Sequence, residues 1–298
     1  QAHRGQGQHP HRMSDVLHPA VAVTPPRSER LPIVCDSPHS GTDYPADFRP
    51  ALPRERLRQG EDTHVAYLWC SAPAHGATLI AARFPRTYID PNRSLADLDP
   101  ALLDGPWPTP LNPGEKSRLG LGLVWRSVDR QPIYDRLLGV AEVRQRIEQY
   151  WKPYHARLEA AIDASVATFG CVWHLNLHSM PNNAYERLGR AAPVPLADFV
   201  LGDRDGTTCD PAFVALVADT LRSFGYTVAI NEPYKGVELI ARIGQPAHGR
   251  HSLQIEIRRP LYMDEATREP NAGYAALQAH LDCLMGVIAG HVRRRTAA

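Results

Sequence analysis

The sequence lacks the features of several large protein classes. It has five cysteines in 298 residues, and no two of them form a Cys-x-x-Cys pair. This argues against a disulfide framework and against a thiolate zinc site. Its charges nearly cancel, with 33 lysines and arginines against 32 aspartates and glutamates. We therefore expect neither nucleic acid nor an acidic membrane as a partner, and a small molecule is the better candidate.

Long hydrophobic runs are also missing. No apolar run approaches the roughly 18 residues of a membrane span, and residues 1–12 are polar and histidine-rich rather than signal-like. These absences lead us to expect no membrane partner and a cytoplasmic location. Met13 resembles a natural start, so we interpret residues 1–12 as a disordered leader or cloning remnant and residues 13–298 as one domain.

The composition that is present is ordinary for a globular protein. Apolar residues make up 43% and charged residues 22%, and the length allows a sizeable core. Short apolar runs alternate with longer helical patterns, which predicts a three-layer α/β/α domain with a mixed, mostly parallel sheet. The predicted strands are residues 32–35, 77–82, 86–89, 171–177, 199–201, 227–229 and 252–257.

Three helices and one long loop are predicted between and after these strands. Apolar spacing indicates a helix over residues 137–162, kinked or divided at Pro153. A second helix, 211–224, begins with an aspartate followed by a proline, and an amphipathic helix over 277–292 closes the chain. Residues 98–113 contain five prolines and are predicted to form a surface loop of the kind that often acts as a lid.

Two histidines directly follow strand-like runs, where open α/β sheets bind ligands. His39 lies on a turn between a proline and a glycine, and His178 ends the run 171–177. A catalytic zinc ion typically takes three protein ligands, so we expect an acidic third ligand from Glu61 or Asp62. The alternative for these two carboxylates is a helix N-terminus, where the macrodipole favours an acid without any metal.

A further carboxylate, Glu256, lies within the predicted strand 252–257. Alternation along this strand places Gln254, Glu256 and Arg258 on one face. A carboxylate there needs either a function or a partner. The alternative to a function is a salt bridge with Arg258 or Arg242 on a solvated face.

Arginines suited to binding a carboxylate lie in the segment 86–93. Arg86 and Arg93 offer planar forks for bidentate recognition, and Asn92 adds a donor. Each of them alone is also compatible with an ordinary surface residue.

In this order, the motifs resemble the N-formylglutamate amidohydrolase family, which includes the formylglutamate deformylases of histidine breakdown. That family is in turn similar to zinc carboxypeptidases, whose Asp-x-Asn-Arg segment binds a substrate carboxylate and whose late glutamate activates water. The implied fold is therefore zinc-carboxypeptidase-like, of the phosphorylase/hydrolase-like type. The matching segments are residues 37–41, 61–65, 86–93, 150–155, 177–180, 234–236, 254–256 and 261–265.

The resemblance implies one Zn²⁺ or other divalent ion per chain. His39, Asp62 and His178 would hold it, with Glu61 as the alternative to Asp62. The carboxypeptidase-like pattern has a glutamate three residues after the first histidine, and Thr42 stands there in this chain. The acidic ligand must therefore come from elsewhere.

The resemblance also implies a mechanism. Glu256 would act as general base for a water that zinc acidifies, and the attack would release formate from N-formyl-L-glutamate or a similar N-formyl or N-acyl amino acid. Asn92 and Arg93, with Arg86, would bind the α-carboxylate of this small-molecule substrate. Arg242 would hold a second carboxylate or the oxyanion, or would instead form a salt bridge with a sheet carboxylate.

Several alternatives remain at this point. Deformylases of histidine breakdown typically have an aspartate two residues before the second histidine, and this chain has Asn176. The acyl group and amino acid of the substrate therefore stay open. A carboxypeptidase-like peptidase or deacylase shares the same site residues, and a non-catalytic binding protein could retain the fold. A serine hydrolase using Ser40 or Ser179 is disfavoured, since neither lies in Gly-x-Ser-x-Gly.

Overall fold

The protein is built on a seven-stranded sheet with the strand order β1-β3-β2-β6-β9-β7-β8. The computed structural model describes residues 18–297, so the predicted leader 1–12 lies outside the described residues. β1 and β7 run antiparallel to their neighbours β3 and β9, and the other pairs are parallel. The strands are β1 Val21–Thr24, β2 Ile33–Ser37, β3 Thr78–Ala82, β6 Val172–Met180, β7 Phe199–Gly202, β8 Val228–Ile230 and β9 Arg250–Arg258.

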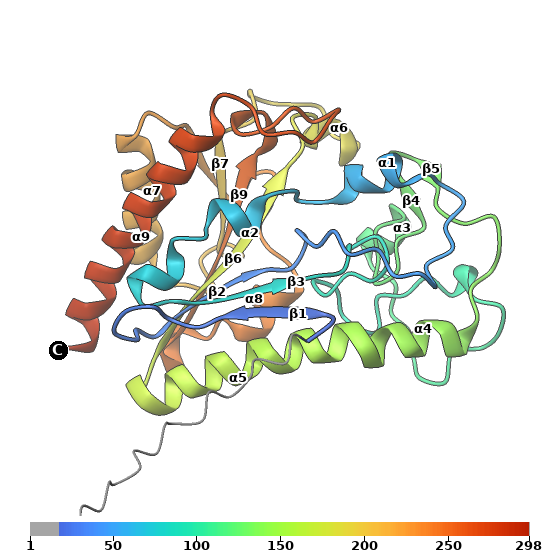
Figure 1. Ribbon diagram of the computed structural model, residues 1–298, viewed down its shortest axis with the longest axis horizontal. Coiled ribbons are helices and arrows are strands. Elements are labelled where there is room, and N and C mark those ends of the chain that lie inside the picture. The colour runs from blue at the N-terminus through green and yellow to red at the C-terminus, as the bar shows by residue number, and fades with distance from the viewer. Residues whose placement is uncertain (1–17, 298) are drawn as a thin grey trace, which may run out of the picture.

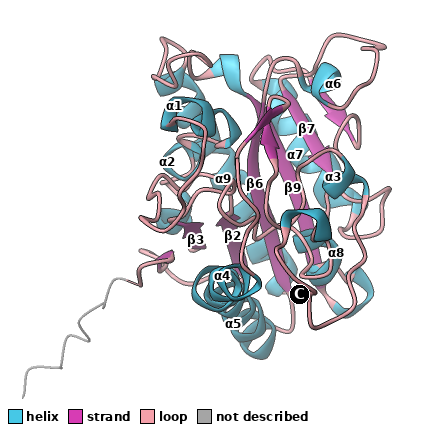
Figure 2. Cartoon of the chain, turned by 90° about the vertical axis from the view of Figure 1, so that its right-hand side faces the viewer, coloured by secondary structure: helices cyan, strands magenta, loops and turns pink. Residues whose placement is uncertain are grey.

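Helices cover both faces of this sheet, which confirms the predicted three-layer α/β/α fold. Figure 1 shows α4 (Val140–Arg146) and α5 (Lys152–Phe169) end to end along one side, and Figure 2, which views the two helices nearly end-on, shows α5 on the side of the sheet where it packs against β2 and β3. On the other side lie α7 (Pro211–Ser223) and α9 (Tyr274–Thr296). The remaining short elements are α1 Arg54–Leu57, α2 Val65–Leu68, α3 Glu115–Arg118, α6 Ala184–Arg187, α8 Glu238–Ile243, and the hairpin of β4 Ser127–Val128 with β5 Gln131–Pro132.

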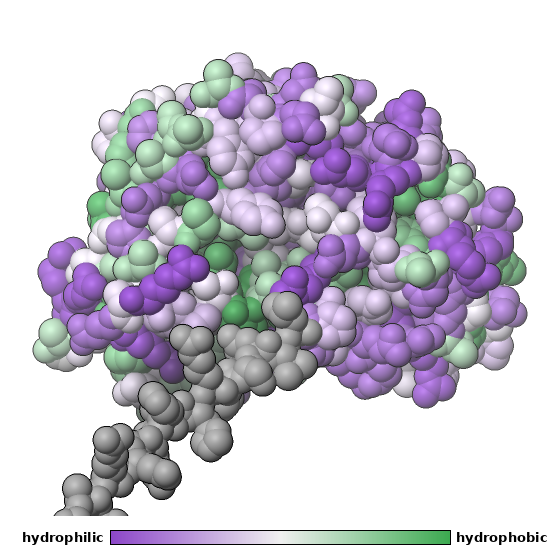
Figure 3. Space-filling model, viewed as in Figure 1, coloured by the Kyte–Doolittle hydropathy of each residue, from purple (hydrophilic) through white to green (hydrophobic). Residues whose placement is uncertain are grey.

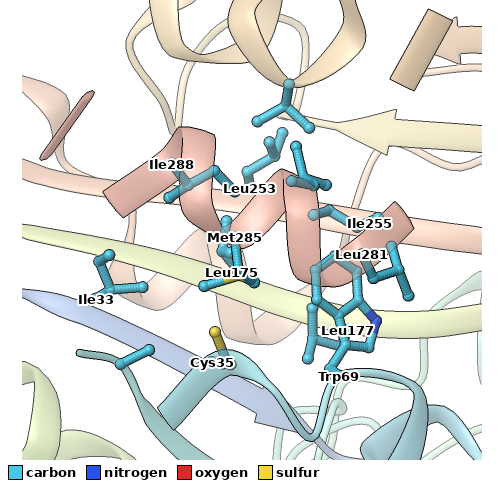
Figure 4. Packing of buried hydrophobic residues seen from close by; sticks show 14 of the residues in the cluster. Ile33, Cys35, Trp69, Leu175, Leu177, Leu253, Ile255, Leu281, Met285 and Ile288 are labelled. Carbon is cyan, nitrogen blue, oxygen red and sulfur yellow. The ribbon is translucent and has the colours of Figure 1, made fainter. Parts of the chain in front are cut away.

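The central strands are buried on both faces. Figure 4 shows Leu175 of β6 and Leu253 of β9 among the buried residues that pack with Leu281 and Met285 of α9. All nine residues of β6 are buried. Such burial is the main favourable term in folding, at roughly 25 cal/mol per Å² of apolar surface. A polar side chain on these strands is therefore either hydrogen-bonded inside the protein or placed there for a ligand.

The long predicted helix is divided, as expected from Pro153. A short π-helical segment, Ile147–Trp151, lies between α4 and α5, just before the proline. Proline has no N–H to donate and its ring crowds the preceding turn, and a π-bulge relieves both problems. The prediction for α7 is also confirmed, because the Asp210 carboxylate caps it by accepting from the Ala212 N–H at 3.0 Å.

Two strand predictions were wrong in opposite ways. Residues 86–89 form turns rather than a strand, since Pro85 and Pro91 flank them and the Tyr88 N–H bonds to the Pro85 carbonyl at 3.0 Å. Strand β1 was not predicted, because its four residues at the sheet edge run directly into two prolines. Both errors reflect short segments whose conformation depends on tertiary contacts.

The last helix, α9, and the surface are the two features to compare with the expectation of no membrane partner. Within residues 18–297, α9 is the helix long and apolar enough to cross a membrane by length and composition. Its residues Leu277, Leu284 and Ile288 are buried against the sheet, as in the core helix of a globular domain. On the face shown in Figure 3, hydrophobic residues are scattered among hydrophilic ones rather than joined in one patch.

Candidate metal centre

Three elements bring His39, Asp62 and His178 together at one edge of the sheet. His39 follows β2, His178 lies near the end of β6, and these two strands pair in parallel. Asp62 lies in the turn before α2, and its backbone N–H bonds to the His39 carbonyl at 2.9 Å. The exposed fractions of the three residues are only 1%, 1% and 3%. The sheet edge predicted from the sequence therefore gathers all three.

The spacing of their ligand atoms suits a metal ion. The Nδ1 atoms of His39 and His178 are 3.1 Å apart, and Asp62 Oδ2 lies 3.5 Å and 3.3 Å from them. Tetrahedral zinc with ligand bonds of about 2.0–2.2 Å separates its ligand atoms by about 3.3–3.6 Å. Asp62 Oδ2 is buried and has no hydrogen-bond partner in the described residues. Three lone pairs that converge in this way repel one another unless a cation lies between them, so this group could hold a metal ion.

The protonation states also favour metal binding. Burial lowers the pKa of His178, which keeps its imidazole neutral and its lone pair available. Burial alone would raise the pKa of Asp62, but the adjacent imidazoles of His178 and His39, 3.3 and 3.5 Å away, and the charge of Arg86 hold it well below its usual range. The carboxylate is therefore ionised, as a ligand must be.

Neighbouring side chains orient both histidines. His39 Nε2 bonds to Asp90 Oδ1 at 2.7 Å, and His178 Nε2 bonds to Asn176 Oδ1. These contacts hold each Nδ1 atom toward the centre of the group, as outer partners of metal-binding histidines do. The sequence analysis did not assign a role to Asp90 in this orientation. Its place in Asp90-x-Asn92-Arg93 was the available signal.

The structure distinguishes Asp62 from Glu61, the alternative ligand. Glu61 accepts hydrogen bonds from Tyr44 at 2.7 Å, Thr63 at 3.0 Å and Arg58 at 3.3 Å. The Glu61 carboxylate therefore has its hydrogen-bond partners within the protein. Asp62, and not Glu61, belongs to the group with the two histidines.

Glu256 lies directly beside this group. It pairs with His178 in the register of β6 and β9, and it is 8% exposed. Its Oε2 atom has no hydrogen-bond partner in residues 18–297. Burial, and then the negative charge of Asp62, raise the pKa of Glu256 well above its ordinary value, although Arg86 and Arg259 oppose the shift. A carboxyl group with a raised pKa is a better proton acceptor than an ordinary glutamate, as a general base requires.

The two proposed salt bridges of Glu256 are absent from the described residues. Arg258 pairs with Asp198 at 2.8 Å. Arg242 pairs with Glu159 at 2.9 Å and with Glu238 at 3.7 Å, and its side chain is 41% exposed. The interpretation of Glu256 as a salt-bridged surface residue was therefore wrong.

Arg242 also needs correction as a substrate-binding candidate. It lies on α8 rather than next to a sheet carboxylate, and its guanidinium extends toward α5, where Glu159 and the Trp151 ring contact it. Helix α8 buries Leu239 and Ile240 and so points Arg242 outward. The structure does not bring Arg242 to the metal group.

The other predicted anchors gather around Asp90. Arg86 Nη2 lies 3.2 Å from Asp90 Oδ2 and its guanidinium stacks on Trp125 at 4.6 Å. Arg93 Nη2 lies 3.6 Å from the same oxygen, while its Nε donates to a backbone carbonyl at 2.9 Å. Asn92 Oδ1 accepts from a backbone N–H of α8 at 3.0 Å. These residues place positive charge beside the metal group.

Arg259 is a site residue that sequence reasoning missed. Its Nη2 donates to Asp62 Oδ1 at 3.0 Å and its Nε donates to Ser179 Oγ at 3.1 Å. Its Nη1 is buried without a partner in the described residues. This guanidinium therefore fixes the metal-group carboxylate and keeps a donor free.

Comparisons with known proteins agree with this geometry. The N-formylglutamate deformylases of Pseudomonas putida and Pseudomonas aeruginosa are each 29% identical over 242 residues, which cover 79% of this chain and 83% and 84% of those proteins. The crystal structure of N-formylglutamate amidohydrolase from Ralstonia eutropha JMP134 matches with a TM-score of 0.91 and 64% identity, over 92% of this chain and 99% of that one. A gene product of Agrobacterium tumefaciens shares the fold, with a TM-score of 0.59 and 20% identity over 91% of this chain and 96% of that one.

A model of the N-formylglutamate amidohydrolase family matches residues 31–263, a span that contains the metal group, Glu256 and Arg259. The chain belongs to the N-formylglutamate amidohydrolase family.

Proposed function

We propose that this amidohydrolase uses zinc to release formate from N-formyl-L-glutamate or a closely similar N-formyl or N-acyl amino acid. The observation that carries the proposal is the pair of unpartnered buried oxygens, Asp62 Oδ2 and Glu256 Oε2, beside two histidine Nδ1 atoms. One oxygen is placed to hold a cation and the other to move a proton. The Pseudomonas and Ralstonia relatives are named N-formylglutamate deformylase and N-formylglutamate amidohydrolase.

The donor set supports zinc as the ion. Two imidazoles and one carboxylate are a common set for catalytic zinc, which keeps a fourth position open. His39, Asp62 and His178 would hold the ion. When bound, it supplies Lewis-acid polarisation of the amide carbonyl and lowers the pKa of water.

Glu256 has the state and position of the proton carrier. It accepts a proton as the water oxygen bonds to the formyl carbon, and it returns the proton to the amide nitrogen as the C–N bond breaks. Formate and the free amino acid are the products. The raised pKa of Glu256 suits both steps, since the group must accept and release a proton at similar pH.

The arginine pair supports a substrate that carries a carboxylate. Arg86 and Arg93 bring two positive charges to the single carboxylate of Asp90, and Arg86 Nη1 also lies 3.7 Å from Asp62 Oδ1 of the metal group. A substrate α-carboxylate would balance this charge with charge-assisted hydrogen bonds. Arg259 Nη1, still without a partner in the described residues, is a further donor for the carbonyl oxygen of the amide.

The test combines metal analysis with a formate assay. Purified protein should hold about one divalent ion per chain, with zinc the dominant ion, and should release formate from N-formyl-L-glutamate. N-acetyl-L-glutamate and a dipeptide ending in glutamate separate deformylase from deacylase and peptidase activity. Metal-free protein with full activity, or hydrolysis of the dipeptide alone, would overturn the proposal.

A further inference from the structure

Helix α3 carries a lysine whose ammonium has no ion-pair partner in the described residues. Lys116 lies on α3, directly after the proline-rich loop 98–113. Within residues 18–297, its ammonium forms neither a salt bridge nor a hydrogen bond, and its contact is the ring of Tyr234, 5.8 Å from Nζ to the centroid. The chain has two other lysines, Lys152 and Lys235, and each of them pairs with a carboxylate. Lys116 therefore differs from both in lacking an ion-pair partner.

The charges that act on the Lys116 ammonium come largely from residues of the proposed site. Burial lowers its pKa to about 8, and the positive charges of Arg93 and Arg86 add to this, while Glu115 and Glu256 oppose it. These charges include the proposed carboxylate anchor and the proposed base. A partly buried ammonium without a counter-ion is costly, and an anionic ligand would reduce that cost.

Hydrogen bonds hold Lys116 in a fixed position relative to Arg93. The Leu121 N–H donates to the Lys116 carbonyl at 2.7 Å, and the Leu121 carbonyl accepts from Arg93 Nε at 2.9 Å. The Asp97 carboxylate anchors α3 itself, because it accepts from Ser117 Oγ at 2.6 Å and from the Gly114 N–H at 2.8 Å. The Leu121 backbone thus links the Lys116 backbone to the Arg93 guanidinium.

Tyr234, whose ring faces the Lys116 ammonium, lies in the segment between β8 and α8. Burial, and then the nearby charge of Glu256, raise the pKa of its hydroxyl. The hydroxyl is therefore neutral and can donate a hydrogen bond. No hydrogen bond of this hydroxyl occurs in the described part of the chain, so it remains available to a ligand.

We propose that Lys116, together with the Tyr234 hydroxyl, binds the side-chain carboxylate of the substrate and so selects an N-formyl dicarboxylic amino acid. This inference rests on the proposed function. Arg93 then binds the α-carboxylate, and the Leu121 backbone holds the segment that carries Lys116 next to Arg93. A compact ammonium suits a single carboxylate at the end of a flexible side chain, where a bidentate fork is not required.

The experiment compares N-formyl-L-glutamate with N-formyl-L-glutamine, which has nearly the same shape and no side-chain charge. Lys116→Met should lower kcat/KM for the glutamate substrate by about 10- to 100-fold, the range for losing one charge-assisted contact, and should leave the glutamine substrate nearly unchanged. Lys116→Arg should keep most of the preference, and Tyr234→Phe should lose a smaller part of it. Lys152→Met, an exposed lysine on α5, is the matched control and should behave as wild type.

A pH series on wild-type protein provides a second readout that needs no variant. The preference for the glutamate substrate in kcat/KM should decline as the pH rises above about 8, where Lys116 loses its charge. The glutamine substrate should not show this decline.

Equal losses on both substrates in Lys116→Met, or a preference that survives at high pH, would overturn the role of Lys116 and leave the proposed function standing. Failure of wild-type protein to release formate from either substrate would instead overturn the proposed function.

Discussion

Two buried clusters of acids and histidines lie on the same strands and differ in how their polar atoms are paired. In the first, which we call the inner cluster, Asp36 Oδ1 accepts from His174 Nε2 at 2.6 Å and from Asn176 at 2.9 Å, and Oδ2 accepts from Tyr154. His174 Nδ1 bonds to Ser252 Oγ at 2.6 Å. The inner cluster thus has the contacts of a Ser-His-Asp triad, but its members are 0% or 1% exposed, so no substrate reaches the serine.

The second cluster, the metal group with Glu256 and Arg259, is also buried, but Glu256 is 8% exposed and the cluster is incompletely paired. Asp62 Oδ2, Glu256 Oε2 and Arg259 Nη1 have no partners in residues 18–297. Buried polar groups in native proteins are rarely left unpaired. The comparison teaches that a ligand site is better recognised by unpaired atoms than by the resemblance of its contacts to a known catalytic arrangement.

The largest expected effect separates the two clusters by metal content. His178→Ala should lose the bound ion and reduce formate release by about 10³-fold or more, because it removes one of three ligands. His174→Ala should keep the ion but lower the free energy of unfolding by about 3–5 kcal/mol, since it leaves Asp36 as an uncompensated buried charge. Metal content, formate release and melting temperature measure all of this. A metal-loaded His178→Ala would remove the assignment of the site.

The second prediction concerns the unpaired oxygen of Glu256. Glu256→Gln keeps the size of the side chain but removes its basicity, so hydrolysis should slow by about 10²–10⁴-fold. Metal content should change little and the variant should stay folded, since no salt bridge is broken. A stable, metal-loaded and fully active variant would exclude Glu256 as the proton carrier.

The third prediction uses pKa shifts of opposite direction in the two clusters. Burial alone would raise the pKa of Asp36, but hydrogen bonds and charge from His174, with Asn176 and Tyr154, lower it. Asp36 therefore contributes stability that is present above its unfolded pKa of about 3.9 and is lost as the pH falls through the lower folded value. Glu256, with a raised pKa, contributes stability that is present below its unfolded pKa of about 4.3 and is lost as the pH rises.

Melting curves of metal-free protein between acid and neutral pH test this contrast. At pH 7, Asp36→Asn should melt below wild type and Glu256→Gln above it. Both differences should shrink as the pH falls below about 4. Shifts of the same sign in the two variants would contradict the different pairing of the two clusters.

The smallest expected effect lies at the edge of the inner cluster. Ser252→Ala removes one hydrogen bond to His174, so the free energy of unfolding should fall by about 1 kcal/mol. Formate release should stay at the wild-type level, in the same assay used for Glu256→Gln. A large loss of activity with unchanged stability would place the inner cluster in the chemistry after all.

Much of the fold and of the metal group could be predicted because the signals are local. The runs that become β2, β6 and β9 are apolar over several residues, and His39 and His178 stand where such runs end. Alternation along β9 placed Glu256 on a polar face, although not in a buried position. These features depend on sequence spacing and not on the final packing.

The parts that sequence reasoning missed depend on distant contacts. Asp90 orients His39 from 51 positions away, and Arg259 reaches Asp62 from 197 positions away. Arg242 was assigned to the site by its neighbourhood in the sequence, yet α8 turns it toward Glu159. Only the folded chain determines which of many arginines faces which carboxylate.

The pairing of His178 with Glu256 across β6 and β9 makes the site intolerant of changes in strand length. Side chains alternate between the two faces of a sheet, so one inserted residue in β9 before Glu256 would turn it toward the α9 side and present an isoleucine to the metal group instead. Two inserted residues would restore the face but move the carboxylate about 7 Å along the strand. Insertions and deletions among homologues should therefore avoid this strand. They should accumulate in the loop 98–113, where extra residues do not alter the pairing of strands.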